Sequence, residues 1–453
     1  MKDADKYFGL RLRLYSTYHN ASQCFSGQRR HRKSGLHSPC DLPSHSGHRI
    51  LTSYLFTLLP KAALMILLDR PYVSSFLLQS LQQHHIAAID TPELQQLQLP
   101  QQPDTISTAE ASKLLSSDPS TRLLCNSENS IGWISDHLSN TPLPEKIRLF
   151  KDKCAFRDLL KDAFPDFFYA EIPAEQLAQT DTSTWSWPII VKPAVGFFSM
   201  AVHRVDNADQ WPVIVEKIHN EIDVFRTEYP QQVLDASRFI VEECIEGEEY
   251  AIDAYYNDVG EPVILNVLHH RFTGGDDVSD RIYTTSAEMV FELHDALNEL
   301  LSVIGTSAEL SHFPVHLEVR ITPEGQVVPI ELNPMRFAGW CTTDIAYHAH
   351  GINPYFYYFD NQKPDWEQIA ALSGDRLTSF VILDRPADVP VDKIKGFDYV
   401  AVLEELEQPV ELRKVNYRNY PVFGIVFAHT LSDEQEELDH LLRADMHDFI
   451  ELA

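Results

Sequence analysis

Apolar and polar positions follow two different periods along the chain, and the changes between them mark the expected elements. Residues 65–69 (MILLD) and 86–90 (IAAID) are short apolar runs typical of buried strands, and the stretch between them has apolar residues at helical spacing. This order of strand, helix and strand predicts a small α/β domain over residues 65–145. Its Gln- and Pro-rich stretch at 91–107 indicates a surface loop.

From residue 146 onward, one helix gives way to a chain dominated by strands. Residues 146–163 (KIRLFKDKCAFRDLLKDA) predict a single helix that ends before Pro165. Runs of apolar and alternating residues predict most of the later elements, and the fold class is therefore α/β (α+β). The expected strands are 187–195, 238–258 (two strands around a turn at 246–249), 261–272 and 313–333 (a hairpin), and the expected helices are 206–222, 286–305 and 433–452.

Four segments divide the chain. We expect an irregular basic extension at 1–64, an N-terminal α/β domain at 65–145, a central domain at 146–360 and a C-terminal subdomain at 361–453. The sequence leaves the role of the last segment open between a lid, a dimer surface and a closing subdomain.

The first 64 residues differ from the rest in charge. They contain ten Lys or Arg and three acidic residues, a net charge of +7, whereas the whole chain carries −29 and the remainder therefore −36. Since Met65 opens the first strand, the native protein begins at Met65 in one interpretation; in two others, residues 1–64 are a targeting leader or a functional arm. Their apolar stretch is interrupted by Pro60 and Lys61, and a membrane span needs roughly 20 unbroken apolar residues.

The acidic balance and the cysteines exclude several classes of function. A net charge of −29 argues against a general nucleic-acid or anionic-membrane surface, because both need a positive field. A small anionic ligand is still compatible, since a few local Lys and Arg residues can hold it. The six Cys show neither a CxxC motif nor zinc-finger spacing with His, so we expect reduced thiols and a cytoplasmic location.

The hairpin at 313–333 has one apolar and one polar face. Side chains alternate across a strand, so the apolar residues of its first strand share the core face. The turn TPEG at 322–325 has Pro at its second position and Gly at its fourth, which suits a tight turn. On the return strand we expect Val328, Ile330 and Leu332 to face the core.

The polar face of this hairpin carries two carboxylates and a carboxamide. Counted from the turn, Glu331 is expected opposite His316 and diagonal to Glu318, and diagonal neighbours are about 7–8 Å apart. Glu318, Glu331 and Asn333 form a set of hard oxygen donors that suits Mg²⁺. The alternative is a solvated face of an antiparallel sheet, where charged residues alternate as a matter of course.

Two further segments have both a functional and a plain interpretation. Lys192 stands at the polar end of an apolar strand, where it reaches either a phosphate or solvent, and Gly196 and Ser199 then suit a flexible loop. Residues 241–250 (VEECIEGEEY) form an extended link with an acidic turn. Such a link offers its backbone to an adenine and a carboxylate to a ribose, although acidic turns between strands are also common.

The order of these segments resembles that of the ATP-grasp superfamily over residues 65–360. The resemblance implies an ATP-grasp fold, in which two lobes hold ATP between antiparallel sheets after a small α/β domain. It also implies ligation, in which ATP phosphorylates a carboxylate and an amine or another nucleophile displaces the phosphate. The matching segments are DKCAFRDLL (152–160), PIIVKP (188–193), VEECIEGEEY (241–250), and the most specific pair, HLEVR (316–320) and IELNPMR (330–336).

The resemblance also implies roles for individual residues. Lys153 and Lys192 are then the lysines that hold the phosphates of ATP, and Ser199 is part of the phosphate loop. The adenine hinge is formed by Glu242, Glu243 and Ile245, and the ribose carboxylate is Glu249. The ligands of Mg²⁺ or Mn²⁺ are Glu318, Glu331 and Asn333, and Arg336 faces the transferred phosphate or the substrate carboxylate. Phe197 and Phe198 stand where many members have Gly or Ser, a departure that concerns the hydrogen bonding of the loop.

No residue is needed as a covalent nucleophile, because phosphoryl transfer depends on positioning and charge neutralisation. We expect Lys192 and Arg336 to be catalytic, with Arg336 stabilising charge on the γ-phosphoryl group and on the acyl phosphate. The polar loop at 268–286 offers substrate contacts, although an ordinary solvated loop has the same composition. Its candidates are His270, Arg271 (also assigned to catalysis), Asp276, Asp277 and Arg281, while Trp340 and Thr342 either shape the acceptor pocket or belong to the core.

The leading hypothesis is an ATP-dependent ligase that joins a carboxylate to the amine of an amino acid or peptide-like substrate. One alternative is a carboxylate–thiol or carboxylase-type enzyme of the same superfamily, although the chain has no biotin-carrier Lys motif. Another is a nucleotide-binding regulatory protein without activity, which the retained lysines and metal ligands disfavour. The expected partners are small molecules rather than nucleic acid or membrane, and a homodimer is compatible with them.

Overall fold

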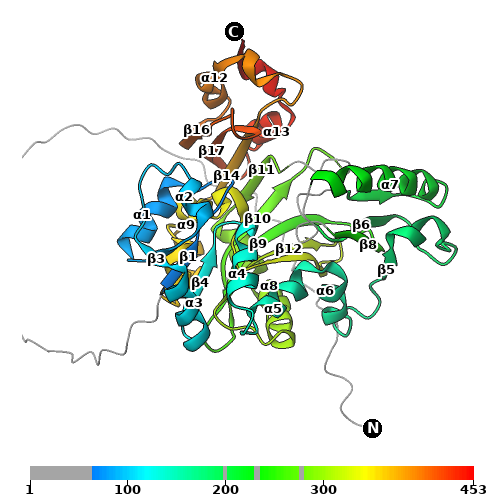
Figure 1. Cartoon of the computed structure of the whole chain (residues 1–453). Helices are drawn as coiled ribbons and strands as arrows, with labels where there is room; N and C mark the ends of the chain where they lie inside the picture. The colour runs from blue at the N-terminus through cyan, green and yellow to red at the C-terminus, as the bar shows by residue number, and fades with distance from the viewer. Residues whose placement is uncertain (1–63, 197–200, 229–234, 275–279, 453) are drawn as a thin grey trace, which may run out of the picture. The chain divides into compact units, whose positions relative to one another are not determined.

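The computed structural model describes residues 64–196, 201–228, 235–274 and 280–452 (Figure 1). The predictions for residues 1–63, for the phosphate loop with Ser199, and for Asp276 and Asp277 lie outside the described residues. The described strands form four sheets, and two of these carry the candidate site.

A parallel four-stranded sheet forms the N-terminal domain, as the pattern of 65–145 predicted. Its strand order is β3-β2-β1-β4, and each neighbouring pair is parallel. Helices cover the sheet, so its strands are apolar on both faces. The elements are β1 (Leu64–Leu67), α1 (Ser75–Gln83), β2 (Ala87–Asp90), α2 (Pro92–Gln96), β3 (Thr105–Ser107), α3 (Thr108–Ser117), β4 (Arg122–Cys125), η1 (Glu128–Ser130) and α4 (Ile131–His137).

The prediction of a plain surface loop at 91–107 is wrong at both ends, because α2 and β3 lie within it. Thr91 caps α2, since its Oγ1 accepts a hydrogen bond from the N–H of Leu94 at 3.1 Å. Pro92 takes the first helical position, where its missing N–H leaves no helical hydrogen bond unmade. Capping at Thr91 thus starts a short helix in a stretch whose composition suggested none.

A four-stranded antiparallel sheet in the order β5-β8-β6-β7 forms a small lobe (Figure 1). Its core packs Trp211 and Ile218 of α7 against Phe239 and Val241 of β8. The elements are β5 (Tyr169–Pro173), η2 (Ala174–Gln179), β6 (Ile189–Val195), β7 (His203–Val205), α7 (Trp211–Glu228) and β8 (Asp235–Glu243).

The single helix predicted over 146–163 is two helices, α5 (Leu143–Lys151) and α6 (Lys153–Leu160). They meet at Asp152, whose backbone is extended with φ −90° and ψ 107°. Its Oδ1 accepts hydrogen bonds from the N–H groups of Cys154 at 3.0 Å and Ala155 at 3.2 Å. An Asp that caps a new helix inside a helical pattern therefore broke the predicted element and made Lys153 the first residue of α6.

The largest sheet has eight strands in the order β13-β12-β9-β10-β11-β14-β17-β16, each antiparallel to its neighbours. Helix α8 packs Leu297 and Leu301 against Ile252 and Val267 of this sheet. Strand β14 lies beyond the boundary predicted at residue 360, and it continues the sheet beside β11. The elements are β9 (Glu248–Tyr256), β10 (Pro262–Arg271), β11 (Ile282–Thr285), α8 (Ala287–Ser307), β12 (Phe313–Ile321), β13 (Val327–Pro334), η3 (Gly339–Asp344), α9 (Ile345–His350), α10 (Pro354–Phe359), α11 (Trp366–Leu372), β14 (Arg376–Asp384), β16 (Gln408–Lys414) and β17 (Val422–Leu431).

The helix predicted over 433–452 is shorter, because α13 ends at Arg443. Arg281 donates from Nη1 to the carbonyl oxygens of Leu442 at 3.2 Å and Ala444 at 2.9 Å, which satisfies acceptors at this helix end. The apolar spacing continues past the helix because Met446 and Phe449 pack in the same core cluster. The elements of this part are η4 (Val391–Lys393), β15 (Ile394–Phe397), α12 (Tyr399–Glu404), α13 (Glu436–Arg443), η5 (Met446–Phe449) and β18 (Ile450–Leu452), which pairs with β15.

Two global expectations concern membranes and thiols. In the ranges that the structure describes, no helix is both long and apolar enough to span a bilayer. The cysteines in the same ranges, Cys125, Cys154, Cys244 and Cys341, are all free, as the prediction of reduced thiols requires.

Candidate active site

The first strand of the β12–β13 hairpin has the two faces that its sequence predicted. Val315 and Leu317 are fully buried in the main core, whereas Glu318 points to the other face and stays partly exposed. The predicted turn is also confirmed, because the N–H of Gly325 donates to the carbonyl oxygen of Thr322 at 2.8 Å.

The register of the return strand differs from the prediction. Glu331 pairs with Glu318, and His316 pairs with Asn333. The strands pair Ile321 with Val327, one position beyond a tight turn at 322–325, and a β-bulge directly after Glu318 adds one further residue on β13. The expected position of Glu331 opposite His316 is therefore wrong, and the correction brings the two carboxylates face to face.

The same bulge changes which residues of β13 reach the core. Leu332 packs in the main core as predicted, but on the turn side of the bulge Val327 takes the core position. Val328 is buried outside this cluster, and Ile330 is only partly buried. One extra residue reverses the alternation of side chains, so Val327 rather than the buried Val328 packs in the main core, and the prediction for Ile330 was wrong.

The two facing carboxylates have opposite electrostatic surroundings. Burial and the nearby charge of Glu331 raise the pKa of Glu318 well above its usual range. Burial alone would also raise the pKa of Glu331, but Lys153, whose Nζ lies 3.1 Å from Oε2, holds it well below its usual range. Nδ2 of Asn333 donates to Oε1 of Glu318 at 3.3 Å and to Oε1 of Glu331 at 3.2 Å.

These three side chains fit a magnesium ion. A divalent cation would relieve the repulsion between Glu318 and Glu331, and turning the amide of Asn333 over would direct its Oδ1 to the same point. The carboxylate side chains are 29% and 27% exposed, so a ligand can reach both. No group of three or more His, Cys, Asp or Glu in the described ranges is arranged to hold a metal. Mg²⁺ commonly takes phosphate and water oxygens beside one or two carboxylates.

Lys153 lies between the carboxylate pair and the start of the phosphate loop. Its Nζ is 3.1 Å from Oε2 of Glu331 and donates to the carbonyl oxygen of Gly196 at 3.3 Å. Burial alone would lower the pKa of Lys153, but Glu331 raises it above its usual value, so the ammonium stays charged. The break at Asp152 is what places this lysine at the first turn of α6.

Lys192 is buried in an ion-pair cluster rather than extended into solvent. Its Nζ lies 2.6 Å from Oε1 of Glu242, and Nε of Arg157 donates to Oε2 of the same carboxylate at 2.9 Å. Burial alone would raise the pKa of Glu242, but the two cations lower it to about 2. The sequence did not single out Arg157, although its position four residues after Lys153 puts both on neighbouring turns of α6.

The predicted hinge crosses from one sheet to the other. Glu243 ends β8 in the small lobe, and β9 begins in the large sheet after Gly247. Nη1 of Arg320 donates to the carbonyl oxygen of Ile245 at 2.9 Å. Gly247 has φ +126°, and a Cβ built there would lie 2.1 Å from the carbonyl oxygen of Ile321. The close approach of β12 therefore requires glycine at this position.

Glu249, the predicted ribose carboxylate, is held by two partners. Oε2 accepts hydrogen bonds from Nε and Nη2 of Arg320 at 3.1 and 3.0 Å, and Oε1 lies 3.1 Å from Nδ1 of His270. Burial alone would raise the pKa of Glu249, but His270 and Arg320 lower it. Arg320 thus links the hinge carbonyl and this carboxylate.

Arg336 reaches back to the N-terminal domain. Its Nη2 and Nε donate to Oε1 of Glu128 at 2.9 and 3.3 Å, and Nζ of Lys151 donates to Oε2 of the same carboxylate at 2.9 Å. Burial alone would raise the pKa of Glu128, but Arg336 and Lys151 lower it to about 2. Sequence reasoning missed Glu128, because 208 positions separate it from Arg336.

The predicted substrate contacts of the second lobe lie against the C-terminal part. Arg271 donates from Nη2 to Oδ1 of Asp439 at 2.6 Å and from Nη1 to Oε1 of Gln435. Arg281 donates to carbonyl oxygens at the end of α13. His270 stacks on Tyr283, with ring centroids 4.3 Å apart, beside Glu249.

Trp340 and Thr342 follow Arg336 in a tightly held segment. Trp340 stacks on Tyr72 of the N-terminal domain at 6.1 Å and meets Tyr420 edge-on at 5.6 Å. Thr342 is buried, and its hydroxyl donates to the carbonyl oxygen of Gly339 at 2.7 Å. Trp340 therefore joins an aromatic cluster shared by three parts of the chain, and Thr342 stabilises the local turn.

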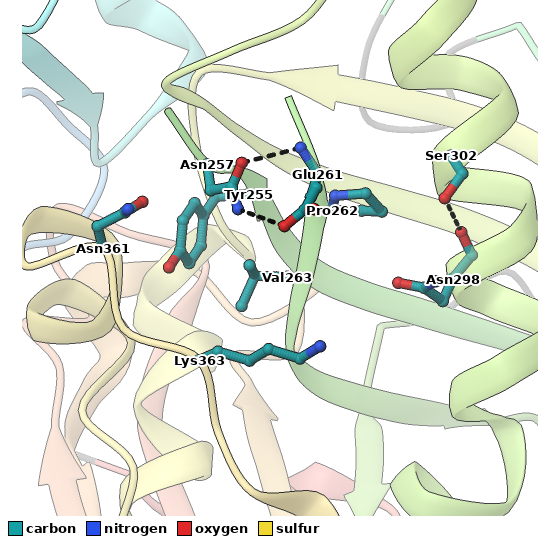
Figure 2. A pocket seen from close by; sticks show the side chains of 9 residues that line it. All are labelled: Tyr255, Asn257, Glu261, Pro262, Val263, Asn298, Ser302, Asn361 and Lys363. Atoms are coloured by element: carbon teal, nitrogen blue, oxygen red, sulfur yellow. Dashed lines mark hydrogen bonds between the residues drawn. The ribbon is translucent and has the colours of Figure 1, made fainter. Parts of the chain in front are cut away.

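A separate hollow of about 320 Å³ lies at the far end of β9 from Glu249. Figure 2 shows Asn257 and Glu261 bonded across the β9–β10 turn, with Asn298 of α8 and Lys363 on other sides of the hollow. Its lining contains none of the predicted site residues, so it is no part of the candidate site.

Comparisons with known proteins identify the fold. Residues 185–344 match the family model of the ATP-grasp domain. No match to the chain was found among curated protein sequences.

Solved structures with the same fold cover most of the chain. An L-amino acid ligase from Bacillus licheniformis is 14% identical, with a TM-score of 0.58 over 87% of this chain and 99% of that one. N5-carboxyaminoimidazole ribonucleotide synthetase from Thermotoga maritima is 13% identical, with a TM-score of 0.57 over 86% and 99%. The biotin carboxylase domain of 2-oxoglutarate carboxylase from Hydrogenobacter thermophilus, solved with MgADP, ADP and bicarbonate, is 12% identical, with a TM-score of 0.53 over 86% and 90%.

Proposed function

We propose that this chain, which has the ATP-grasp fold and an ATP-grasp domain over residues 185–344, is an ATP-dependent ligase. It activates a carboxylate as an acyl phosphate and joins it to the amine of an amino acid or peptide-like substrate. The observation that carries the proposal is the convergence of a lysine, two carboxylates and an amide at one point, where Lys153 of α6 meets the Glu318–Glu331 pair and Asn333.

Lys153 and Lys192 would hold the phosphates of ATP. Both are paired with carboxylates, which fixes the two buried lysine side chains before the nucleotide arrives. Glu318, Glu331 and Asn333 would hold Mg²⁺, which neutralises phosphate charge when bound, and Mn²⁺ accepts the same oxygen donors. Ser199 belongs to the proposal as a residue of the phosphate loop.

The adenosine would lie against the link between the two sheets. Glu242, Glu243 and Ile245 form the proposed adenine hinge, in which Glu242 acts through its ion pair with Lys192. Glu249 would accept hydrogen bonds from the ribose hydroxyls, and Arg320 holds it in place. Gly247 supports this assignment because it lets the link pass against the backbone of β12.

The reaction divides into two displacements. A carboxylate oxygen of the first substrate attacks the γ-phosphorus, and the bond to ADP breaks. The neutral amine of the second substrate then attacks the acyl carbon, inorganic phosphate leaves, and the amine gives up a proton. Arg336 would stabilise charge on the phosphoryl group and on the acyl phosphate. Arg271 would contact the substrate from the second lobe.

A carboxylase-type reaction is the second candidate. It is favoured by the likeness to the biotin carboxylase domain solved with bicarbonate, an acid that ATP can activate in the same way. Both candidates use small molecules, and the free cysteines fit the cytoplasmic location that the sequence predicted. We also propose a homodimer as the assembly to test.

Release of ADP and phosphate from Mg²⁺-ATP tests the proposal. The protein would be incubated with pooled amino acids and small carboxylates, with bicarbonate as a separate pool. Release that needs an amino-acid pool and disappears in Glu331→Ala, but not in the control Glu324→Gln, supports the ligase. Glu324 lies exposed in the turn of the same hairpin. Release with bicarbonate alone supports the carboxylase type, and absence of ATP binding removes both.

A further inference from the structure

The N-terminal sheet presents a ligand-binding edge to Arg336. In its strand order, β3-β2-β1-β4, the strands β2 and β3 lie on one side of β1 and β4 lies on the other. In parallel α/β sheets, ligands bind outside the carboxyl ends of the strands at such a point. The loops that follow β1 and β4 are joined there by Asn126, whose Nδ2 donates to the carbonyl oxygens of Asp69 at 2.9 Å and Tyr72 at 3.1 Å.

Glu128 stands in the second of these loops and holds two cations. Its Oε1 accepts from Arg336 and its Oε2 from Lys151, both at 2.9 Å. The Arg336 side chain is 13% exposed and that of Glu128 21%, so solvent screens the pair only partly. By contrast, the side chains of the Glu145–Arg148 pair on α5 are 72% and 74% exposed, so solvent screens this pair strongly.

The hydrogen bonds of Arg336 leave part of its guanidinium available. Arginine has five N–H groups. Nε and Nη2 donate to Glu128, and Nη1 donates to the carbonyl oxygen of Phe337 at 2.9 Å. Two N–H groups, one on each terminal nitrogen, have no acceptor among the residues that the structure describes, and a bidentate contact to a phosphate or carboxylate uses two.

We propose that Glu128 is a positioning residue that fixes the guanidinium of Arg336 so that its two remaining N–H groups meet the γ-phosphoryl group of the nucleotide. The inference rests on the proposed function, because it takes the role of Arg336 from there. Glu128 brings the N-terminal domain into the active site, with the carboxyl edge of its sheet as one wall. Lys151 supports this arrangement by holding the second oxygen of the same carboxylate.

The test compares nucleotides with and without a γ-phosphate, so it needs no acceptor substrate. Binding of Mg²⁺-AMP-PNP and of Mg²⁺-ADP would be measured by calorimetry for the wild type, Glu128→Gln and the control Glu145→Gln. We expect Glu128→Gln to lower the preference for AMP-PNP over ADP by about tenfold, the scale of one charge-assisted hydrogen bond. The affinity for ADP should stay close to that of the control, whereas the melting temperature should fall below it, because Arg336 and Lys151 lose their shared carboxylate.

A double variant makes the test specific to Arg336. In an Arg336→Lys background the guanidinium with its two N–H groups is absent. Glu128→Gln should then change the preference for AMP-PNP over ADP no further. An unchanged preference in the single variant, an equal loss for both nucleotides, or a full additional loss in the Arg336→Lys background would each overturn the inference and leave the proposed function standing. A wild type that binds neither nucleotide would remove the proposed function, and the inference with it.

Discussion

Glu318 and Glu331 occupy directly opposite positions on β12 and β13, with Lys153 bonded to only one of them. Like charges that face each other across two strands destabilise the sheet. Burial and this repulsion raise the pKa of Glu318. The arrangement therefore stores unfavourable electrostatic energy that a divalent cation would relieve.

Glu318→Gln should separate the destabilisation caused by this carboxylate pair from its contribution to metal binding. Without metal, the variant loses the repulsion and should melt about one degree higher, the scale of about 1 kcal/mol in a chain of this size. With Mg²⁺-AMP-PNP, it should lose most of the stabilisation that the ligand gives the wild type, because one metal ligand is missing. Thermal unfolding with and without the ligand measures both effects. Glu324→Gln, in the turn of the same hairpin, should change neither, and a Glu318→Gln protein stabilised as strongly as the wild type would contradict the metal assignment.

Glu242 should make stability depend on pH in the acid range. Its pKa is about 2 in the folded protein against 4.5 for an unperturbed Glu, so the folded state favours the charged form. This contribution, on the order of 3 kcal/mol, is present above about pH 4.5 and is lost as the pH falls toward 2. The difference in melting temperature between the wild type and Glu242→Gln should therefore shrink from pH 6 to pH 3.

The control for this prediction is Asp206→Asn. Asp206 pairs with Arg204 in the same lobe at 2.8 Å, but the two side chains are 52% and 42% exposed. Its variant should lie within about 0.5 kcal/mol of the wild type. A gap for Glu242→Gln that stays constant across the pH range would show that the ion pairs do not set the pKa.

Gly247→Ala should weaken both the fold and nucleotide binding. The new Cβ would lie 2.1 Å from the carbonyl oxygen of Ile321, at a backbone φ of +126° that L-residues rarely adopt. We expect a loss of at least about 2 kcal/mol in unfolding free energy, together with weaker binding of ATP, because the hinge must move. Denaturant unfolding and calorimetry measure the two quantities. Gly132→Ala, in helix α4 with open space around it, is the matched control and should be neutral or slightly stabilising.

Arg271 has two possible roles, contact with the substrate and anchoring of α13 through Asp439. If Arg271 contacts substrate, Arg271→Gln should lower kcat/KM by tenfold or more, the scale of one charged hydrogen bond. Asp439→Asn, which removes only its partner on α13, should then cost much less. Steady-state kinetics on the substrates found in the pooled assay decides the matter. Equal losses in the two variants would assign Arg271 to anchoring alone.

Local patterns along the chain were sufficient for most elements and for several residues of the candidate site. Alternation identified the polar face with Glu318, and residue type identified the hard oxygen donors. The apolar runs around residues 65–90 predicted a β-α-β unit, which the parallel sheet confirms. These features depend on neighbours within a few positions, so the sequence contains them.

Local periodicity did not predict the helix ends that are set by capping interactions. The carboxylate of Asp152 starts α6 inside a continuous helical pattern, and Arg281 caps the end of α13 within another. A single hydrogen bond at a helix end outweighs the small propensity differences from which the pattern is read. The breaks in both predicted helices follow from this.

The sequence by itself determined which side chains the first strand of the hairpin offers on its polar face, because residue types and their alternation are local properties. The tertiary structure decided how these groups meet. The bulge on β13 set the facing of Glu318 and Glu331, and folding across 208 positions brought Glu128 to Arg336. Register and long-range contact are set by the packing of whole sheets against one another, which no short stretch of sequence contains.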